Sequence, residues 1–422
     1  MIRWNKIKRV IASVLSVFCL PISFFGCDKG KETANYDFDK SGFYGLCEVF
    51  GDMGGALDPG ITNEWIADMA GALGVKSFRM WINYGSMFEV DENNELIPNR
   101  SQIAIVRDAV DRLKAAGVEN LLAMTTSFVY PADYPTTTIY VVPDPYEEYE
   151  TYIEFLELQQ KAYKAFATEF PEVLYYEPAN EPELNGCIHR NGYTHGGSDI
   201  VNASYIYSQY DQVRIVADMC WYTTQALKEV NPEIQVMNPS LCGLTTTPDY
   251  LNDLYEAIES GALPVGQEKS DIDPDNYFQI LNWHPYTFGS DTVTETWLQL
   301  QNDIYQQAID HGDDGTPVWF TEFGWTDNGV EAYQQKIADA YVGFFDMVRA
   351  EMPWLQTAMI FRLTTLATQD ISLGENNFGI MYNKDDPLHG GEPKAAAIAI
   401  AKYIRGEDAD LSGLYKYVKN KQ

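Results

Sequence analysis

The chain has 422 residues, of which 45% are hydrophobic and 14% aromatic, so it can bury a sizeable core and does not have a disordered composition. Its 61 acidic residues outnumber its 29 basic ones, and the formal charge of -32 would repel the phosphates of a nucleic acid. We therefore expect a globular protein with an acidic surface, in one large domain or two ordinary ones, and no nucleic-acid partner.

Residues 1–26 are typical of an export signal, because basic residues precede an apolar run that is short for a membrane-spanning helix. The run ends in SFFGC, which resembles a lipobox, in which the cysteine, here Cys27, is lipidated and becomes the first residue. Phe24 and Phe25 depart from that pattern, so cleavage without lipidation or an uncleaved anchor stays open. We expect an exported cell-envelope lipoprotein, at the outer face, in the periplasm or released, with membrane contact only through Cys27. Residues 27–42 are polar and predict a tether.

From residue 43 to residue 405, short β-prone runs alternate with longer segments of helical periodicity, which is typical of βα units and a parallel sheet. The predicted strands are residues 43–50, 76–82, 118–125, 172–180, 234–240, 276–284, 316–322 and 355–363. The predicted helices are residues 62–73, 101–116, 146–169, 204–230, 248–260, 291–311, 329–351 and 393–405. This alternation predicts an α/β fold, a single (β/α)8 TIM barrel over residues 43–406, followed by a C-terminal tail at 407–422.

Three connections in this barrel are long, and each follows a predicted strand: residues 126–145, 183–203 and 364–392. The strand-to-helix loops of a (β/α)8 barrel surround the face that carries active sites. We therefore expect these loops to border the functional site.

Two glutamates stand at strand ends: Glu181, in ANEPE, follows the fourth strand, and Glu322, in TEFGW, ends the seventh. In a barrel both would point into the mouth from nearly opposite sides. Two facing carboxyl groups suit glycosidic bond cleavage, because one can protonate the leaving oxygen while the other attacks the anomeric carbon or activates water. Of the flanking acids, Glu177 is expected to find a structural partner inside the barrel. Glu183 is expected to be solvated or to contact substrate.

These motifs resemble the clan A glycoside hydrolases, the retaining (β/α)8 enzymes that include families 5 and 39. The resemblance covers nearly all of residues 43–405 and implies that Glu181 is the acid/base and Glu322 the nucleophile, with no cofactor and no metal. It also implies contacts to the sugar or to the nucleophile from Arg79, Asn180, His284 and Tyr286. The tryptophan that usually ends strand eight is missing from MIFRLTT, so Phe361 would replace it as sugar platform or Trp325 would take a neighbouring role.

In a retaining site the carboxyl groups lie roughly 5 Å apart, so both cannot ionise easily. Glu322 would carry the charge, and the pKa of Glu181 should be raised. The predicted substrate is a β-linked oligo- or polysaccharide, with endo action on a β-glucan or β-mannan, or alternatively exo action as a β-xylosidase or β-glucosidase. Three tryptophans are expected at the barrel mouth: Trp81, Trp283 and Trp325.

Two other classes of function remain open. A metal-dependent barrel hydrolase would need clustered ligands, and only CIHRNGYTH, with Cys187, His189 and His195, offers a zinc-like set. A non-catalytic glycan-binding lipoprotein would need aromatic and polar contacts but not both glutamates. Cys187 and Cys242 each follow a predicted strand and could pair, although unpaired thiols are the default.

Overall fold

The structure is a computed structural model that describes residues 42–49, 61–136, 140–184, 187–194, 202–265, 272–287, 292–365 and 377–418. All of these lie in one compact unit, Thr33–Gln422. The predicted export signal, Cys27 and almost all of the tether fall outside the described residues. Within the described ranges, no helix combines the length and apolarity needed to cross a membrane.

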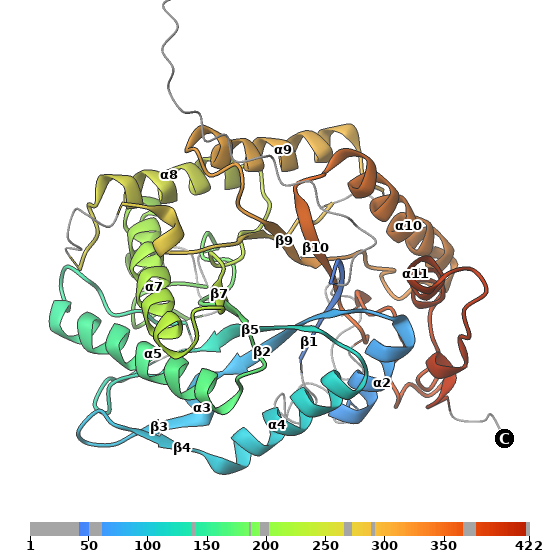
Figure 1. Ribbon diagram of the computed structural model, residues 1–422, viewed down its shortest axis with the longest axis horizontal. Helices are drawn as coiled ribbons and strands as arrows, with labels where there is room; N and C mark the ends of the chain where they lie inside the picture. Colours follow the sequence, from blue (N-terminus) through green and yellow to red (C-terminus); the bar gives the residue numbers. More distant parts are fainter. Residues whose placement is uncertain are drawn as a thin grey trace, which may run out of the picture. The chain divides into compact units, whose positions relative to one another are not determined.

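Eight parallel strands form the sheet: β1 (Tyr44–Glu48), β2 (Ser77–Asn83), β5 (Asn120–Ser127), β6 (Tyr175–Glu177), β7 (Gln235–Val236), β8 (Leu281–Trp283), β9 (Val318–Phe323) and β10 (Leu355–Phe361) (Figure 1). Each pairs with its neighbour in this order except β7 with β8, and β1 pairs with β10. The two short strands β7 and β8 are joined by single bridges, Met237 with Ile280 and Leu241 with Trp283. The predicted (β/α)8 barrel is therefore confirmed.

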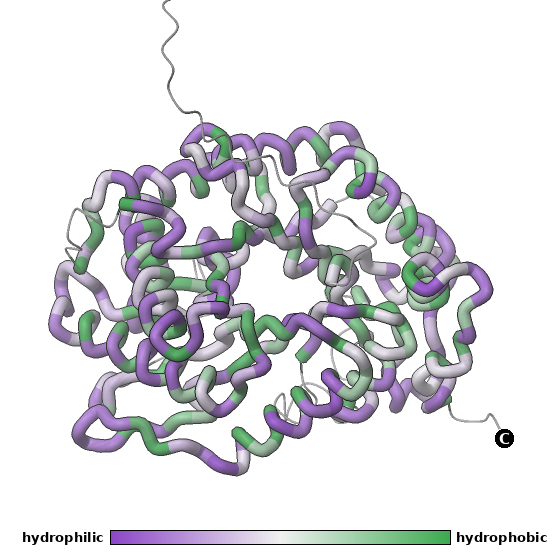
Figure 2. The backbone as a smooth tube through the Cα atoms, in the orientation of Figure 1, coloured by the Kyte–Doolittle hydropathy of each residue, from purple (hydrophilic) through white to green (hydrophobic). Residues whose placement is uncertain are grey.

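The eight predicted helices are present and lie outside the strands: α2 (Asn63–Leu73), α4 (Arg100–Ala115), α5 (Tyr149–Glu169), α7 (Gln209–Val230), α8 (Thr247–Ser260), α9 (Glu295–Asp310), α10 (Gln334–Glu351) and α11 (Ala395–Arg405) (Figure 1). Several begin at a residue whose side chain accepts a backbone N–H of the first turn, as Thr62, Ser208 and Thr294 do. Figure 2 shows hydrophilic and hydrophobic residues interleaved along them, as expected for helices with one face on the sheet.

Some local structure is not predicted by the sequence pattern. After β2 the chain forms a one-turn helix, α3 (Tyr84–Met87), and an antiparallel hairpin of β3 (Phe88–Val90) and β4 (Leu96–Pro98). The strand predicted at 172–180 is shorter, because Pro178 has no N–H to continue the ladder beyond β6. The segment after Arg405 carries a 3-10 helix, η6 (Ser412–Tyr415), which packs on α2 with Leu414 fully buried.

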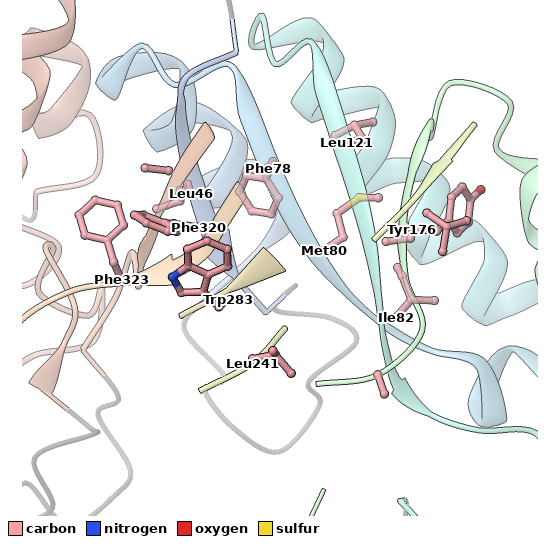
Figure 3. Packing of buried hydrophobic residues seen from close by; sticks show 14 of the residues in the cluster. Leu46, Phe78, Met80, Ile82, Leu121, Tyr176, Leu241, Trp283, Phe320 and Phe323 are labelled. Atoms are coloured by element: carbon pink, nitrogen blue, oxygen red, sulfur yellow. The ribbon is translucent and has the colours of Figure 1, made fainter. Parts of the chain in front are cut away.

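Alternation along the strands separates the core from the barrel interior. On β2, Phe78, Met80 and Ile82 belong to the main hydrophobic cluster around the strands (Figure 3). The intervening Arg79 and Trp81 therefore face the barrel interior. A smaller apolar cluster fills that interior nearer the amino ends of the strands, made of Leu122, Met237, Ile280, Trp319 and Met359. Polar residues follow one layer higher, toward the carboxyl ends.

Candidate active site

An irregularity in β9 turns Glu322 into the barrel. Between two consecutive pairings with β10, β9 contributes two residues, Thr321 and Glu322, where β10 contributes only Met359. This bulge interrupts the alternation, so both side chains face the interior, whereas Phe323 packs outward on Phe344 of α10 with ring centroids 4.0 Å apart. The sequence predicts a strand end at Glu322, and the bulge sets the direction of its side chain.

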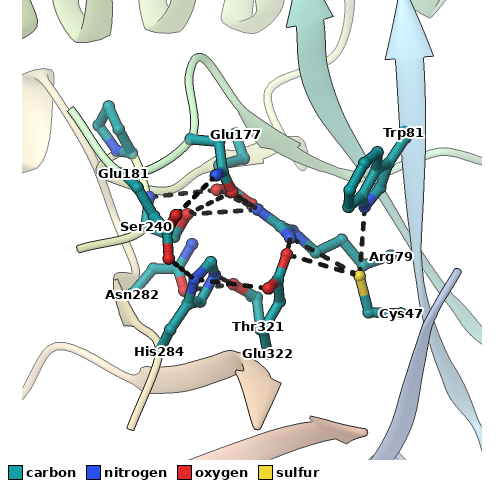
Figure 4. Close-up of polar contacts among 12 residues, drawn as sticks. Cys47, Arg79, Trp81, Glu177, Glu181, Ser240, Asn282, His284, Thr321 and Glu322 are labelled. Carbon is teal, nitrogen blue, oxygen red and sulfur yellow. Dashed lines mark hydrogen bonds and ion pairs between the residues drawn. The ribbon is translucent and has the colours of Figure 1, made fainter. Parts of the chain in front are cut away.

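Arg79, on β2, is fully buried at the centre of the polar network (Figure 4). Its Nε and Nη2 donate to the Glu177 carboxylate at 2.9 and 2.7 Å, and its Nη1 donates to Glu322. Burial alone would lower the pKa of Arg79, but the charges of Glu177 and Glu322 outweigh it and raise this pKa well above its usual value. One cation therefore compensates two buried carboxylates, and the partner expected for Glu177 inside the barrel is Arg79.

Replacing Arg79 with methionine should lower the free energy of unfolding by about 3–5 kcal/mol, because it leaves buried carboxylates without their counter-charge. Urea unfolding monitored by tryptophan fluorescence would measure this loss. Arg79→Lys keeps the charge but not the two-pronged contact with Glu177, so an intermediate loss is expected. A methionine variant as stable as the parent protein would contradict the role of Arg79 as shared counter-ion.

Two neutral donors also hold Glu322. The Tyr286 hydroxyl donates to its Oε2 at 2.9 Å, and the Cys47 thiol lies 3.9 Å from its Oε1. Burial, followed by the charge of Glu322, raises the pKa of Tyr286 well above its usual value and that of Cys47 to about 12, so both keep their protons. The other neighbours of the Cys47 sulfur are donors, the Trp81 indole N–H at 3.2 Å and Arg79 Nη1 at 3.7 Å. The thiol hydrogen is therefore left for Glu322. No sequence motif marks Cys47, and the sequence analysis missed it.

Glu181 lies after β6 in a left-handed backbone conformation, with φ of 44°. This conformation costs a non-glycine residue about 1–2 kcal/mol. It is held by hydrogen bonds from the Glu181 N–H to Ser240 O at 2.8 Å and from the Leu184 N–H to Glu181 O at 2.9 Å. The carboxyl group meets His284 Nδ1 at 2.8 Å and accepts from Asn180 Nδ2 at 3.4 Å.

The environment of Glu181 lowers its pKa. Burial of the carboxyl raises the pKa, but the hydrogen bond and positive charge of His284 outweigh burial, with further help from Arg79 and Asn180. The expectation of a raised pKa for Glu181 is therefore wrong in this structure. It considered the like charge of Glu322 but not the histidine that the fold brings against Glu181.

The hydrogen-bond network assigns the protons of His284. Thr321 donates its only hydroxyl hydrogen to Asn282 Oδ1 at 2.7 Å, so His284 Nε2, 3.2 Å from the same hydroxyl, is the donor to Thr321. The contact between Nδ1 and Glu181 then contains one proton, whichever atom carries it. The Glu181–His284 pair therefore holds a proton beside the cavity.

The same imidazole bounds the separation of the two glutamates. His284 Nδ1 lies 2.8 Å from Glu181 Oε1 and 3.7 Å from Glu322 Oε2, so these two oxygens can be no farther apart than the sum of the two distances. This upper limit does not exceed the smallest separation between the carboxyl groups of inverting glycosidases, about 6.5 Å. It allows the separation of roughly 5 Å that is typical of retaining glycosidases. The side chain of Glu181 is 20% exposed and that of Glu322 is 8% exposed.

A cavity of about 460 Å³ adjoins both carboxyl groups, within the about 300–1,000 Å³ typical of small-molecule sites. Its lining residues are Trp81, Asn180, Glu181, Leu184, Cys242, Leu244, Tyr286, Glu322, Phe361 and Phe378. The rings of Trp81 and Phe361 are nearly parallel, with centroids 6.5 Å apart. Phe361 is thus at the cavity, as the sequence predicts, whereas Phe378, in the long connection after β10, was not singled out.

Several predicted site residues lie elsewhere. Trp325 is buried against Tyr341 of α10 and does not line this cavity, so its expected place beside the sugar is wrong. Trp283 is fully buried and donates to Gln301 of α9 at 2.7 Å, because its neighbour His284 takes the inward position. Glu183 is not a solvated residue; its carboxyl is folded inward, with one oxygen fully buried.

The zinc-like set is only partly described, because His195 falls outside the described residues. His189 stacks on Tyr193, with centroids 4.4 Å apart, and its Nδ1 lies 3.0 Å from Arg190 O. Among the described residues no group of three or more His, Cys, Asp or Glu side chains could hold a metal ion. Cys187 and Cys242 are free thiols in the structure.

No protein-family model matches the chain, and no curated protein matches it. Solved structures do. A family 39 glycoside hydrolase from Bacteroides cellulosilyticus matches with a TM-score of 0.54 and 14% identity over 87% of this chain, which spans 64% of that one. A monomeric β-xylosidase from Caulobacter crescentus matches with a TM-score of 0.52 and 12% identity, covering 86% of this chain and 67% of that chain. A broad-specificity family 5 endoglucanase from Clostridium acetobutylicum gives a TM-score of 0.54 and 14% identity, covering 86% and 96%.

These similarities establish the fold: the chain shares the (β/α)8 barrel of glycoside hydrolase families 39 and 5. The resemblance to clan A that the motifs indicate is confirmed at the level of the fold.

Proposed function

We propose that the protein is a retaining glycoside hydrolase that cleaves β-linked glycans through a covalent glycosyl-enzyme intermediate. The observation that carries this proposal is that Glu181 and Glu322, from opposite sides of the barrel, both lie within 3.7 Å of one imidazole nitrogen and line one cavity. The fold shared with family 39 and family 5 enzymes supports it.

In the first step the Glu322 carboxylate attacks the anomeric carbon while Glu181 gives a proton to the leaving oxygen. Arg79, Tyr286 and Cys47 direct their hydrogens at the Glu322 carboxyl, as suits a negatively charged nucleophile. The proton held between Glu181 and His284 is the one transferred. A sugar that covers the exposed fifth of Glu181 removes water from it, which raises its pKa toward that of a general acid.

In the second step the ester at Glu322 no longer carries a charge, so Glu181 becomes more acidic and acts as a base toward water. Water attacks the anomeric carbon from the side that the leaving group occupied. The configuration of the sugar is thereby retained, and Glu322 leaves as a free carboxylate.

We also propose endo action on a β-glucan or β-mannan, because long loops follow the strands around the mouth. Exo action as a β-xylosidase or β-glucosidase is the second candidate, and the structural neighbours named above include both an endoglucanase and a β-xylosidase. In either case the barrel itself works without a cofactor.

The direct test is to assay the chain without residues 1–26 on β-glucans, mannans, xylans and aryl glycosides, and to follow the anomer released first by NMR. We expect a β-linked substrate and a β-anomer as initial product. Oligosaccharide products indicate endo action and monosaccharide products exo action. Release of α-linked products only, or an α-anomer formed first from a β-linked substrate, would contradict the mechanism.

Export and anchoring at Cys27 are a separate proposal, supported by the N-terminal sequence. Cells that express the full chain and are fed an alkyne-labelled fatty acid should label the parent protein, while Cys27→Ser should be exported without label. Cys242→Ser, which changes another thiol of the chain, serves as control and should remain labelled. Equal labelling of parent and Cys27→Ser would contradict the anchor.

A further inference from the structure

Glu183 lies two residues after the proposed acid/base and joins two loops of the cavity. Its Oε1 accepts a hydrogen bond from the Thr247 hydroxyl at the start of α8. Thr247 in turn accepts from the Leu244 N–H at 2.9 Å, so the side chain of Glu183 ties the turn after Glu181 to the loop between β7 and α8. Both tied segments line the active-site cavity, through Leu184 on one side and Leu244 on the other.

The contacts of Glu183 suit a neutral carboxyl. Its fully buried Oε2 has no well-formed hydrogen bond among the described residues, and beside Thr247 the backbone N–H of Cys242 is a further donor that favours the charged carboxyl only in part. An ionised carboxylate needs good donors on both oxygens. In the part of the chain that the structure describes, no lysine or arginine forms an ion pair with it. The titratable groups that face it from the described segments are Glu181, Cys187, Cys242, Tyr250 and His284.

We propose that Glu183 is a positioning residue for Glu181, which fastens the acid/base turn to the loop before α8 as a neutral, protonated carboxyl. This inference rests on the proposed role of Glu181. Burial raises the pKa of Glu183 to about 7. The hydrogen bonds from Thr247 and Cys242 oppose this rise, and the charge of Glu181 adds to it. Ionisation above that pH places a second negative charge beside Glu181 and favours release of the buried carboxyl to water. The turn that aims Glu181 then loosens.

The sign of the effect on stability follows from the raised pKa. Between its ordinary pKa and about 7, Glu183 holds a proton in the folded protein that it loses in the unfolded chain. The contribution of Glu183 to stability is therefore fully present below its ordinary pKa and is lost as the pH rises through about 7.

Glu183→Gln tests the proposal, because the amide keeps the size and one acceptor oxygen but cannot ionise. Near about pH 6 we expect kcat/KM within about twofold of the parent value, and the alkaline decline that begins near pH 7 should move upward. Glu183→Ala, which removes the tie, should lower kcat by about 10- to 100-fold with little change in KM. Glu256→Gln, an exposed glutamate of α8, is the matched control and should leave the pH profile unchanged.

A second measurement does not depend on activity. Between about pH 5 and about pH 8, the Tm of the parent protein should fall relative to that of Glu183→Gln. If the Tm difference between the parent protein and Glu183→Gln stays constant with pH, and their pH profiles of kcat/KM superimpose, the conclusion that Glu183 is neutral would be overturned. A fully active Glu183→Ala would overturn the positioning role. If the parent protein cleaves no glycan, the proposed function fails, while the Tm comparison still reports on Glu183.

Discussion

Replacing Glu322 with alanine should lower kcat on an aryl β-glycoside by about 10⁵- to 10⁶-fold, as removal of a covalent nucleophile does elsewhere. The reason is geometric: Glu322 is the carboxylate toward which Arg79, Tyr286 and Cys47 direct their hydrogens. Among the described residues that line the cavity, the other carboxyl group is Glu181, which lies on the opposite side. Initial-rate kinetics of the purified variant measure the effect, and circular dichroism verifies the fold.

Azide distinguishes loss of the nucleophile from a general loss of function. In Glu322→Ala an azide ion can enter the space left by the carboxylate and attack the anomeric carbon from the same side, while Glu181 protonates the leaving oxygen. The expected product is an α-glycosyl azide, which NMR identifies. The alternative is a glycan-binding lipoprotein. In that case the parent protein would cleave no glycan, and Glu322→Ala would bind glycans with the same affinity as the parent.

Replacing Glu181 with alanine should lower kcat by about 10²- to 10⁴-fold on substrates with poor leaving groups. A dinitrophenolate leaves without protonation, so with that substrate the first step should stay fast and the glycosyl-enzyme should accumulate. The measurement is a burst of dinitrophenolate equal to the enzyme concentration, followed by slow turnover.

The anomer of the azide product again distinguishes the acid/base from the nucleophile. Because Glu322 is intact in Glu181→Ala, azide attacks the glycosyl-enzyme from the opposite side and gives a β-glycosyl azide. Asn180→Ala is a useful comparison, since it removes the neighbour that donates to Glu181 at 3.4 Å without removing the acid/base. The same azide anomer from the Glu181 and Glu322 variants would show that the two roles are assigned incorrectly.

The order of elements could be predicted because each depends on local pattern. The strand around Phe320 is a short run of apolar and β-branched residues, and the helix from Gln334 repeats its buried positions every three to four residues. The departures are local as well. The hairpin from Phe88 to Pro98 is too short for a clear period, and Pro178 ends β6 early.

The site was predictable only in part. Glu181 and Glu322 could be placed at strand ends, and Arg79, Asn180 and Tyr286 meet them as expected. Trp325 and Trp283 were misplaced because sequence position gives the height of a residue along the barrel but not which way its ring turns.

The sequence by itself determined the alternation of strands and helices. It thereby also determined that Glu181 and Glu322 lie at the carboxyl ends of two strands. Only the tertiary structure decided where their side chains point, through a bulge at Thr321 and Glu322 and a left-handed residue at Glu181. It also decided what each acid contacts, Arg79 and Cys47 for Glu322 and His284 for Glu181, all from other strands. The physical reason is range: backbone periodicity depends on neighbours in the chain, whereas side-chain direction and charge balance depend on groups that meet only when the barrel closes.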